Sequence, residues 1–536
     1  MDFLNLFPYS NVLAACGAIL GLCFWYYSQA YKYWKNRGIP YVEPEMFFGN
    51  TKEFFLMRTP FAQTFEKLYQ KLQGHNYGGV FSLLKPILLL RDPELIKNFM
   101  IKDFSHFHDR TGVVDKVNNP LSQHLFNLQG NTWRKLRIKL SPTFTSGKIK
   151  MMFLLMKECA EEMSEHLKDS AKNGECLEWK DVAANYTTDV IGTCAFGMQF
   201  NAIQDPNSEL RVLGRKLVGT PTWPKLRTLR RMVVSMFPVL APLLDAQFPS
   251  KAVSDSFLKT VKEIVDLREK NNIKRKDFMQ LLIQLKNEGR VEEDNEIMLN
   301  GEEQRNGHQK TEVYEDDLKM TDDLLAAQVF VFFVGGFETS STTISFCLQE
   351  LAMNPDVQHR LQEEIDSVLR ETGGEVTYEA IHKMKYLDQV MSETLRKYPP
   401  LGILFRKCTK TYTIPGTEKT IDAGTDVFIP ILALHYDPKY FPQPNRFDPD
   451  RFREENKNQI PHYAYLPFGE GPRICIGMRF GMVQVKLGLV ALLRHYEFKV
   501  CEKTNIPLRI DPKSFLTAPL GGIWLQITNR STPVDQ

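Results

Sequence analysis

Apolar residues recur at three- and four-residue spacing along most of the chain from about Phe61 onward. Such spacing places them on one side of a helix, so it predicts that most of the chain is helical. Strand signals cluster in two regions, 80–90 and 412–429, and the second alternates apolar with polar residues between turns at Pro415-Gly416 and Ala423-Gly424. The pattern therefore predicts a mainly α, α+β fold: a helix-rich domain with small β-sheets.

The N-terminal pattern differs, because residues 12–27 carry no charge and are mostly apolar. With its flanking residues this stretch is long enough to cross a thin bilayer as one helix, with Trp25 and the two tyrosines that follow at the interface. Lys32, Lys35 and Arg37 follow it and only Asp2 precedes it, which predicts that the rest of the chain is cytosolic. A cleaved secretory signal is the alternative, but basic residues after the apolar run disfavour it.

These patterns divide the chain into three predicted parts. Residues 1–30 form a membrane anchor, residues 31–45 form a stiff, proline-bearing hinge, and residues 46–536 form the catalytic domain. Within that domain, residues 288–317 hold eleven acidic against three basic residues, which predicts a flexible surface loop. Residues 220–249 mix apolar and basic side chains, as either a membrane-surface segment or a core helix with a basic outer face would.

Composition narrows the functional classes. The chain has 536 residues, of which 43% are hydrophobic and 24% charged, as expected for a globular protein with a large core. A net charge of +3 is too small to indicate a nucleic-acid partner. Nine scattered cysteines argue against a disulfide framework and for a reducing compartment.

The most informative chemistry lies in residues 468–477, where Cys475 stands among glycines and follows Arg473 by two positions. An apolar helical run follows directly, so a Cys475 thiolate would face free backbone N–H groups at a helix N-terminus. The glycines allow the backbone to approach a large flat group, and Arg473 could pair with an anion on it. A cysteine in this setting suits a charged axial ligand of haem iron; the alternative is an inert cysteine in a glycine-rich turn.

Phe468-Gly-x-Gly-x-Arg473-x-Cys475-x-Gly477 resembles the haem-binding loop of the haem-thiolate monooxygenases, the cytochromes P450. The resemblance implies haem b (iron protoporphyrin IX) bound by the Cys475 thiolate, with Phe468, Arg473 and Gly477 in contact with the cofactor.

Residues 330–340 read as an apolar helix interrupted by two glycines and a carboxylate. Glycine in mid-helix costs about 1 kcal/mol relative to alanine, so a reason for it is expected. The segment resembles the family's oxygen-binding helix, with Gly335 in place of the usual alanine. By that resemblance Thr339 hydrogen-bonds bound dioxygen and Glu338 helps to deliver protons.

Glu393 and Arg396 lie three residues apart, on one helix face, which alone would indicate a surface ion pair. Their setting resembles the family's Glu-x-x-Arg helix, and Pro444-Asn445-Arg446-Phe447 resembles its downstream arginine segment. Together they imply a buried structural network of Glu393, Arg396 and Arg446.

Trp133 and Arg137 lie one helical turn apart, as in the family's helix that contacts the haem propionates. Arg473, and with it Arg406, would complete that clamp, because guanidinium binds carboxylates through two hydrogen bonds. A basic face behind the thiolate loop is expected to receive an acidic redox partner; its candidate residues are Arg134, Lys135, Lys139, Lys148, Lys150, Arg479 and Lys486.

The resemblance covers nearly the whole chain. Residues 37–44, 140–148 and 468–477 resemble the sixth family of insect microsomal P450s, which is associated with oxidation of plant toxins and insecticides. It implies an endoplasmic reticulum enzyme that receives NADPH electrons from cytochrome P450 reductase, with cytochrome b5 as a second candidate partner. The alternatives are a haem-thiolate isomerase or dehydratase without a reductase, a non-enzymatic haem sensor or carrier, and a monooxygenase of endogenous hormones or lipids. By position in the family pattern, the substrate pocket is expected to include Leu125, Phe126, Phe333, Phe337, Leu401, Leu404 and Leu516.

Overall fold

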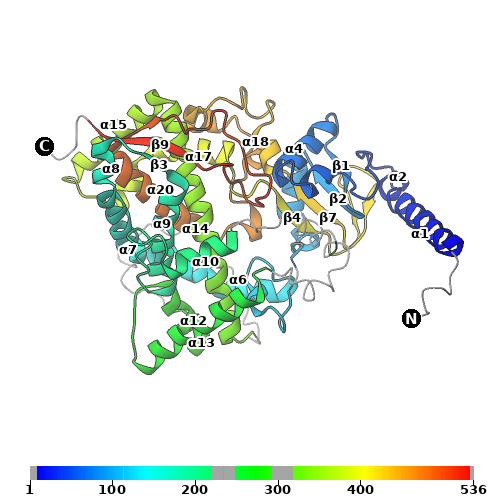
Figure 1. Cartoon of the computed structure of the whole chain (residues 1–536), viewed down its shortest axis with the longest axis horizontal. Coiled ribbons are helices and arrows are strands. Elements are labelled where there is room, and N and C mark those ends of the chain that lie inside the picture. The colour runs from blue at the N-terminus through cyan, green and yellow to red at the C-terminus, as the bar shows by residue number, and fades with distance from the viewer. Residues whose placement is uncertain (1–8, 113, 219–232, 234–247, 292–317, 531–536) are drawn as a thin grey trace.

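The computed structural model describes residues 9–112, 114–218, 233, 248–291 and 318–530. Helices dominate, as the spacing of apolar residues predicts (Figure 1). The longer helices are α1 (Tyr9–Ala30), α4 (Phe61–Lys71), α6 (Gly130–Leu140), α7 (Ser146–His166), α9 (Trp179–Ile191), α10 (Glu209–Val218), α12 (Lys251–Lys270), α13 (Phe278–Glu288), α14 (Asp322–Met353), α15 (Pro355–Glu371), α17 (Lys385–Lys397) and α20 (Met478–Leu493). The shorter ones are α2 (Tyr33–Asn36), α3 (Lys52–Phe55), α5 (Pro93–Lys97), α8 (Lys168–Asn173), α16 (Tyr378–Lys383), α18 (Ile431–His435) and α19 (Glu454–Lys457).

The strands form three small sheets. The largest has the order β1 (Tyr77–Ser82), β2 (Lys85–Leu90), β7 (Asp426–Ile429), β4 (Leu404–Lys407), and its only parallel pair is β2 with β7 among the strands described. A second sheet joins β3 (Cys176–Glu178), β9 (Trp524–Asn529) and β8 (Tyr496–Val500), and a third pairs β5 (Tyr412–Thr413) with β6 (Thr420–Ile421). The two regions with strand signals therefore supply β1, β2, β5, β6 and β7, which confirms the α+β class.

Helix α14 runs through the centre of the helical part, where it packs against α9, α20 and α12 (Figure 1). Its 32 residues are apolar on nearly all sides, as expected for a helix surrounded by protein. The helix is long and apolar enough to cross a membrane, but 67% of its most apolar window is buried inside the molecule. Its hydrophobicity therefore reflects a position in the core.

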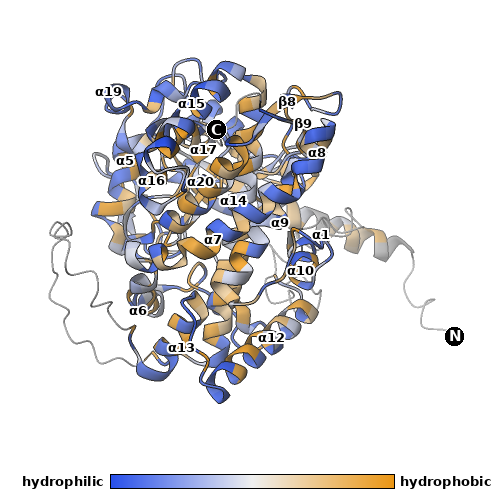
Figure 2. Ribbon diagram, turned by 90° about the vertical axis from the view of Figure 1, so that its left-hand side faces the viewer, coloured by the Kyte–Doolittle hydropathy of each residue, from blue (hydrophilic) through white to orange (hydrophobic). Residues whose placement is uncertain are grey.

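Helix α1 projects away from this body (Figure 2). It carries exposed apolar side chains. Leu22, Phe24 and Trp25 are each about 60% exposed or more, and residues 13–36 form a candidate membrane span. The segment after α1 packs onto the four-stranded sheet, because Trp34 is fully buried and its Nε1 donates a hydrogen bond to the Val80 carbonyl at 3.1 Å. Arg37 also forms an ion pair with Asp422. The anchor is thus joined to the body by a docked segment.

The buried network on α17 differs from its prediction in one member. Arg396 forms a bidentate pair with Glu393, with nitrogen–oxygen distances of 2.7 and 2.8 Å, and both side chains are fully buried. Arg451 approaches Glu393 Oε1 at 3.4 Å, whereas Arg446 is exposed and offers only its backbone carbonyl to Arg396. Arg446 was therefore the wrong choice: the short helical turn Pro449–Phe452 turns Arg451 toward the carboxylate and leaves Arg446 facing solvent.

Two further expectations concern surface segments and cysteines. The acidic stretch 288–317 lies outside the described residues except for 288–291, and most of 220–249 lies outside them as well. Cys176 of β3 and Cys501, just after β8, form a disulfide, and the cysteine pattern did not predict this pair. Since the other described cysteines are free, no disulfide framework holds the described part of the fold together.

Two variants test whether Arg451, and not Arg446, belongs to the buried network of Glu393 and Arg396. We expect Arg451→Leu to lower the free energy of unfolding by about 1–3 kcal/mol, because it removes a cation near a buried carboxylate. Arg446→Leu should change it by less than about 0.5 kcal/mol, because that side chain is exposed. Thermal unfolding of both variants measures the difference, and equal effects would contradict the assignment of Arg451.

Candidate functional site

The Cys475 loop is held by backbone geometry that glycine permits. Gly469 and Gly471 both have φ of +72°, and a Cβ on Gly471 would lie 2.5 Å from the Met100 carbonyl oxygen. The Cys475 backbone N–H donates to the Phe468 carbonyl at 3.0 Å, which closes the loop directly before α20 begins at Met478. Cys475 therefore stands just before a helix N-terminus, as its sequence setting predicts.

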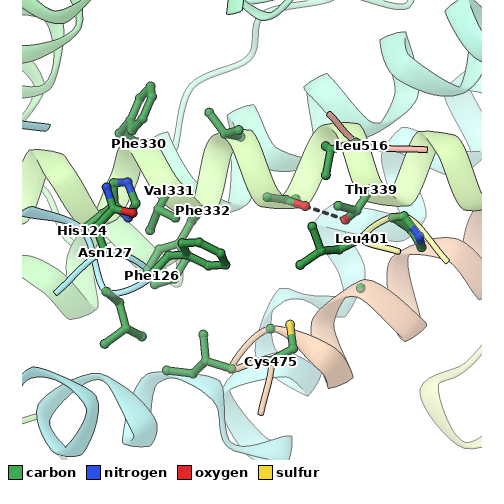
Figure 3. A pocket seen from close by; sticks show the side chains of 18 of the residues that line it. His124, Phe126, Asn127, Phe330, Val331, Phe332, Thr339, Leu401, Cys475 and Leu516 are labelled. Atoms are coloured by element: carbon green, nitrogen blue, oxygen red, sulfur yellow. Dashed lines mark hydrogen bonds between the residues drawn. The ribbon is translucent and has the colours of Figure 1, made fainter. Parts of the chain in front are cut away.

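The Cys475 side chain opens into an internal cavity (Figure 3). Burial raises the pKa of its thiol, while the Gly477 backbone N–H, Arg110 and Arg137 act to lower that pKa. The opposing influences come from different sources, because the low dielectric of the interior disfavours a thiolate and the surrounding positive groups favour it. A cation bonded to sulfur would favour the thiolate further.

The cavity has a volume of about 1860 Å³. Pockets for one small ligand usually measure about 300–1,000 Å³, so this cavity can hold a large group together with a second molecule. Its walls come from the Cys475 loop, α14, α6, the segment around the short helical turn η3 (Pro120–Gln123), and residues after α17. Segments distant in the sequence thus converge on one space.

One face of α14 forms the wall that includes Thr339 (Figure 3). A Cβ on Gly335 would meet no atom within 4 Å, whereas a Cβ on Gly336 would lie 2.3 Å from Ile191 Cδ1 of α9. The two glycines therefore do different things: Gly335 leaves the cavity open, and Gly336 lets α9 approach. Thr339 Oγ1 donates a hydrogen bond to the Gly335 carbonyl at 2.6 Å, which holds the hydroxyl at the cavity surface.

Helical phase explains which predicted pocket residues reach the cavity. Leu125, Phe126, Leu401, Leu404 and Leu516 all line it. Phe333 and Phe337 do not: their rings stack on each other at 4.9 Å and point into the core, toward Gly214 of α10. They lie about 100° or more around the helix from the Gly335–Thr339 face, so the prediction for these two was wrong. Phe330, Val331 and Phe332 line the cavity from α14 instead.

Glu338 is buried and points away from the cavity. Its Oε2 lies 3.0 Å from Lys180 Nζ of α9, and the same ammonium donates to Ser341 Oγ at 2.6 Å. Sequence reasoning missed Lys180, because a pairing between helices so far apart in the chain leaves no local signal. Glu338 and Thr339 are neighbours on α14, but Glu338 contacts Lys180 of α9 whereas Thr339 lines the cavity.

Arginine side chains gather beside the cavity. Arg473 is buried, donates to the Leu128 carbonyl at 2.7 Å, and lies over the Trp133 ring with its guanidinium carbon 3.9 Å from the ring centre. Arg137 lines the cavity, and Arg406 lies fully buried with no partner for its Nε. Sequence reasoning missed Arg110, which donates to the Arg473 carbonyl at 3.0 Å and lies in a loop without periodic pattern.

This cluster holds more positive charge than its neighbours balance. Burial, followed by the neighbouring guanidinium groups, lowers the pKa of Arg473 to about 8, and burial together with Arg110 lowers that of Arg406 to about 9. The Asp109 carboxylate lies 3.9 Å from the Arg473 guanidinium and balances part of its charge. An anionic ligand would relieve the repulsion. A cavity with a thiol at one wall and unbalanced arginines at its edge fits haem, with Cys475 toward the iron and the arginines toward the propionates.

The predicted basic face behind the loop is smaller than expected. Lys486 is buried, 2.8 Å from Asp388, and Lys148 is buried as well, so neither belongs to the surface. Lys150, Arg134 and Arg479 are exposed, and Lys150 pairs with Glu379. The prediction was wrong for Lys148 and Lys486, because their stems lie on helix faces that pack inward.

Comparisons with known proteins agree with this geometry. The model of the family described as cytochrome P450 matches residues 40–525. The chain is 40% identical to cytochrome P450 6k1 of Blattella germanica over 98% of both chains. It is 42% identical to cytochrome P450 6a2 of Drosophila melanogaster over 95% of this chain and 98% of that protein. Cytochrome P450 9e2 of Blattella germanica is 40% identical over 93% of this chain and 94% of that protein.

Arg137 and Arg134 provide a matched test of haem binding, because they share one helix and only Arg137 lines the cavity. A charge-assisted hydrogen bond contributes about 1.5–3 kcal/mol, so Arg137→Leu should speed haem loss roughly 10- to 100-fold. Arg134→Leu should leave the rate unchanged. Haem transfer to an excess of an apo-haem acceptor protein measures both rates, and equal rates in the two variants would contradict the clamp.

Proposed function

Since the chain belongs to the cytochrome P450 family of haem-thiolate monooxygenases, we propose that it oxidises lipophilic foreign compounds, such as plant toxins or insecticides. It inserts one atom of O2 into them with NADPH electrons from cytochrome P450 reductase. The observation that carries the proposal is the placement of Cys475 and Thr339 on facing walls of one cavity (Figure 3). Its largely apolar and aromatic lining supports a lipophilic substrate.

Haem is held in this proposal by residues from distant segments. Cys475 would supply the thiolate, Phe468 and Gly477 would contact the cofactor from the loop, and Trp133, Arg137, Arg406 and Arg473 would hold its carboxylates. When bound, haem with a thiolate ligand supplies the oxygen activation. The chain supplies the ligand, the charge balance and a largely apolar space.

Proton delivery rests on α14. Thr339 Oγ1, which donates to the Gly335 carbonyl, lies at the cavity surface and can instead donate a proton toward a ligand there. Glu338 is the proton carrier behind it, and its carboxylate contacts Lys180 on the side away from the cavity. Release of that ion pair would let the Glu338 carboxylate turn toward Thr339.

Electrons enter from the face behind the thiolate loop. Exposed Arg134 and Arg479, with Lys135, Lys139 and Lys150, would meet acidic groups of the reductase or of cytochrome b5. Helix α1 would hold the enzyme in the endoplasmic reticulum membrane, and Lys32, Lys35 and Arg37 after it favour a cytoplasmic catalytic domain. Anchor, hinge and catalytic domain follow the limits 1–30, 31–45 and 46–536.

Reconstitution tests the proposal. The full chain with haem, purified reductase, NADPH and vesicles should convert lipophilic test compounds into products that carry one atom from isotopically labelled O2. Product formed without NADPH or reductase would instead favour the isomerase or dehydratase alternative. Oxidation of endogenous hormones or lipids alone would overturn the xenobiotic assignment.

A variant in the same assay tests the proton route. We expect Glu338→Gln to slow product formation about 100-fold or more, in the range of general acid–base catalysis, without weakening substrate binding. Glu350→Gln is the matched control, because Glu350 is also buried on α14 and is paired with Lys397 at 2.7 Å, outside the cavity lining. An equal loss of turnover in both variants would contradict a proton role for Glu338.

A further inference from the structure

One buried polar side chain in the cavity wall has a nitrogen without a hydrogen-bond partner among the described residues. His124 follows the turn η3, is 8% exposed, and lines the cavity. Its Nδ1 has no hydrogen-bond partner among the described residues. A buried polar atom left without a partner destabilises a protein by about 1–3 kcal/mol, so an imidazole with no hydrogen-bond partner in a cavity wall points to a polar ligand that would turn the ring toward it.

The surroundings of His124 are aromatic. Its ring centre lies 6.4 Å from that of Phe126 and 6.3 Å from that of Phe330. Phe248 also lines the cavity, and its ring centre lies 6.1 Å from that of Phe330. This part of the cavity therefore presents one polar ring among three phenylalanines.

A second unpartnered atom lies on the same wall. Asn119, at the other end of η3, also lines the cavity and is 5% exposed. Its Nδ2 donates to the Phe248 carbonyl at 3.1 Å, whereas its Oδ1 has no partner. An amide oxygen can only accept a hydrogen bond. The wall thus holds a second polar group, besides the imidazole, whose hydrogen-bonding capacity is not filled.

His124 is held in place by its backbone. Its carbonyl accepts hydrogen bonds from the N–H groups of Asn127 and Leu128, and the next residue, Leu125, donates to Gln328 Oε1 of α14 at 2.9 Å. Figure 3 places His124 and Asn127 at the end of the cavity away from Cys475. A ligand group bound there would be fixed at a distance from the reacting end.

The imidazole is uncharged under ordinary conditions. Burial, with a smaller contribution from Arg110, lowers the pKa of His124 to about 4. A neutral imidazole carries one N–H donor and one acceptor nitrogen. It therefore suits an uncharged partner that both donates and accepts, which is what a hydroxyl group does.

We propose that His124 anchors substrates through a hydroxyl group at the end of an elongated aromatic molecule and so decides which carbon faces Cys475. The proposal rests on the monooxygenase function above and deepens it. Phe126, Phe248 and Phe330 hold the aromatic body, and His124 is a specificity-determining residue. The preferred substrates are phenols or alcohols with a polar end and an apolar end.

Two probes of nearly equal shape test the proposal: 4-phenylphenol carries the hydroxyl, and 4-methylbiphenyl replaces it with a methyl group. The full-length, haem-loaded protein is titrated with each, and the spin-state shift of the Soret band reports the Kd. We expect the wild type to bind 4-phenylphenol at least tenfold more tightly, equivalent to about 1.4 kcal/mol. The turnover product of 4-phenylphenol should carry the new oxygen mainly on the distal ring.

Variants separate the anchor from general packing. His124→Leu should weaken binding of 4-phenylphenol about tenfold, leave the Kd of 4-methylbiphenyl unchanged, and spread oxidation over both rings. His124→Asn should restore most of the preference, because an asparagine amide, like a neutral imidazole, offers both a donor and an acceptor at this position.

Three outcomes would contradict the proposed role of His124. The first is equal affinity of the wild type for both probes, as expected if His124 holds only water. The second is an equal loss of affinity for both probes in His124→Leu, and the third is a His124→Asn variant that does not regain the preference for 4-phenylphenol. The thiolate-type CO band of each variant is recorded first. A variant that keeps this band and loses discrimination tests His124 alone, whereas a wild type without the band would overturn the proposed function.

Discussion

Stabilising a buried thiolate at Cys475 is the constraint on which the proposed site depends. A thiolate in a protein interior is unfavourable unless positive charge and hydrogen-bond donors compensate for the water that it loses. The chain meets part of that demand at Cys475 with a glycine-bearing loop, the N-terminus of α20, the Gly477 N–H group, and the charges of Arg110 and Arg137, although burial still raises the pKa of the thiol. The arginine cluster also lacks balancing anions, and in the proposed function haem would satisfy both requirements, because it would bring a cation to the sulfur and carboxylates to the arginines.

Helix α14 forms the cavity wall opposite Cys475. Three of its faces have separate tasks, and the helical repeat assigns them. One face, with Gly335 and Thr339, borders the cavity; a second, with Phe333 and Phe337, packs into the core; a third directs Glu338 toward Lys180. Because neighbours in sequence point in different directions, the helix can combine a dry pocket with a charged residue one position away from its hydroxyl.

Sequence reasoning succeeded where the information is local. The Cys475 loop is set by closely spaced glycines and a following helix, and α1 and the first hairpin are set by runs of apolar residues. It failed where partners are distant: Arg446 and Arg451 lie in similar local patterns, and only packing against Glu393 separates them. Lys180, Arg110 and the disulfide partner of Cys176 leave no periodic signal, and the unpartnered His124 nitrogen exists only once the cavity is formed.

The most direct measurement of the central claim compares two cysteines that line the same cavity, Cys475 and Cys194. Each is replaced by alanine, and the absorption spectrum of the reduced protein is recorded under CO. The account predicts that Cys194→Ala retains the red-shifted Soret band of thiolate-ligated haem and that Cys475→Ala loses it. A Cys475→Ala protein that kept the band, or a wild type that never showed it, would contradict the account.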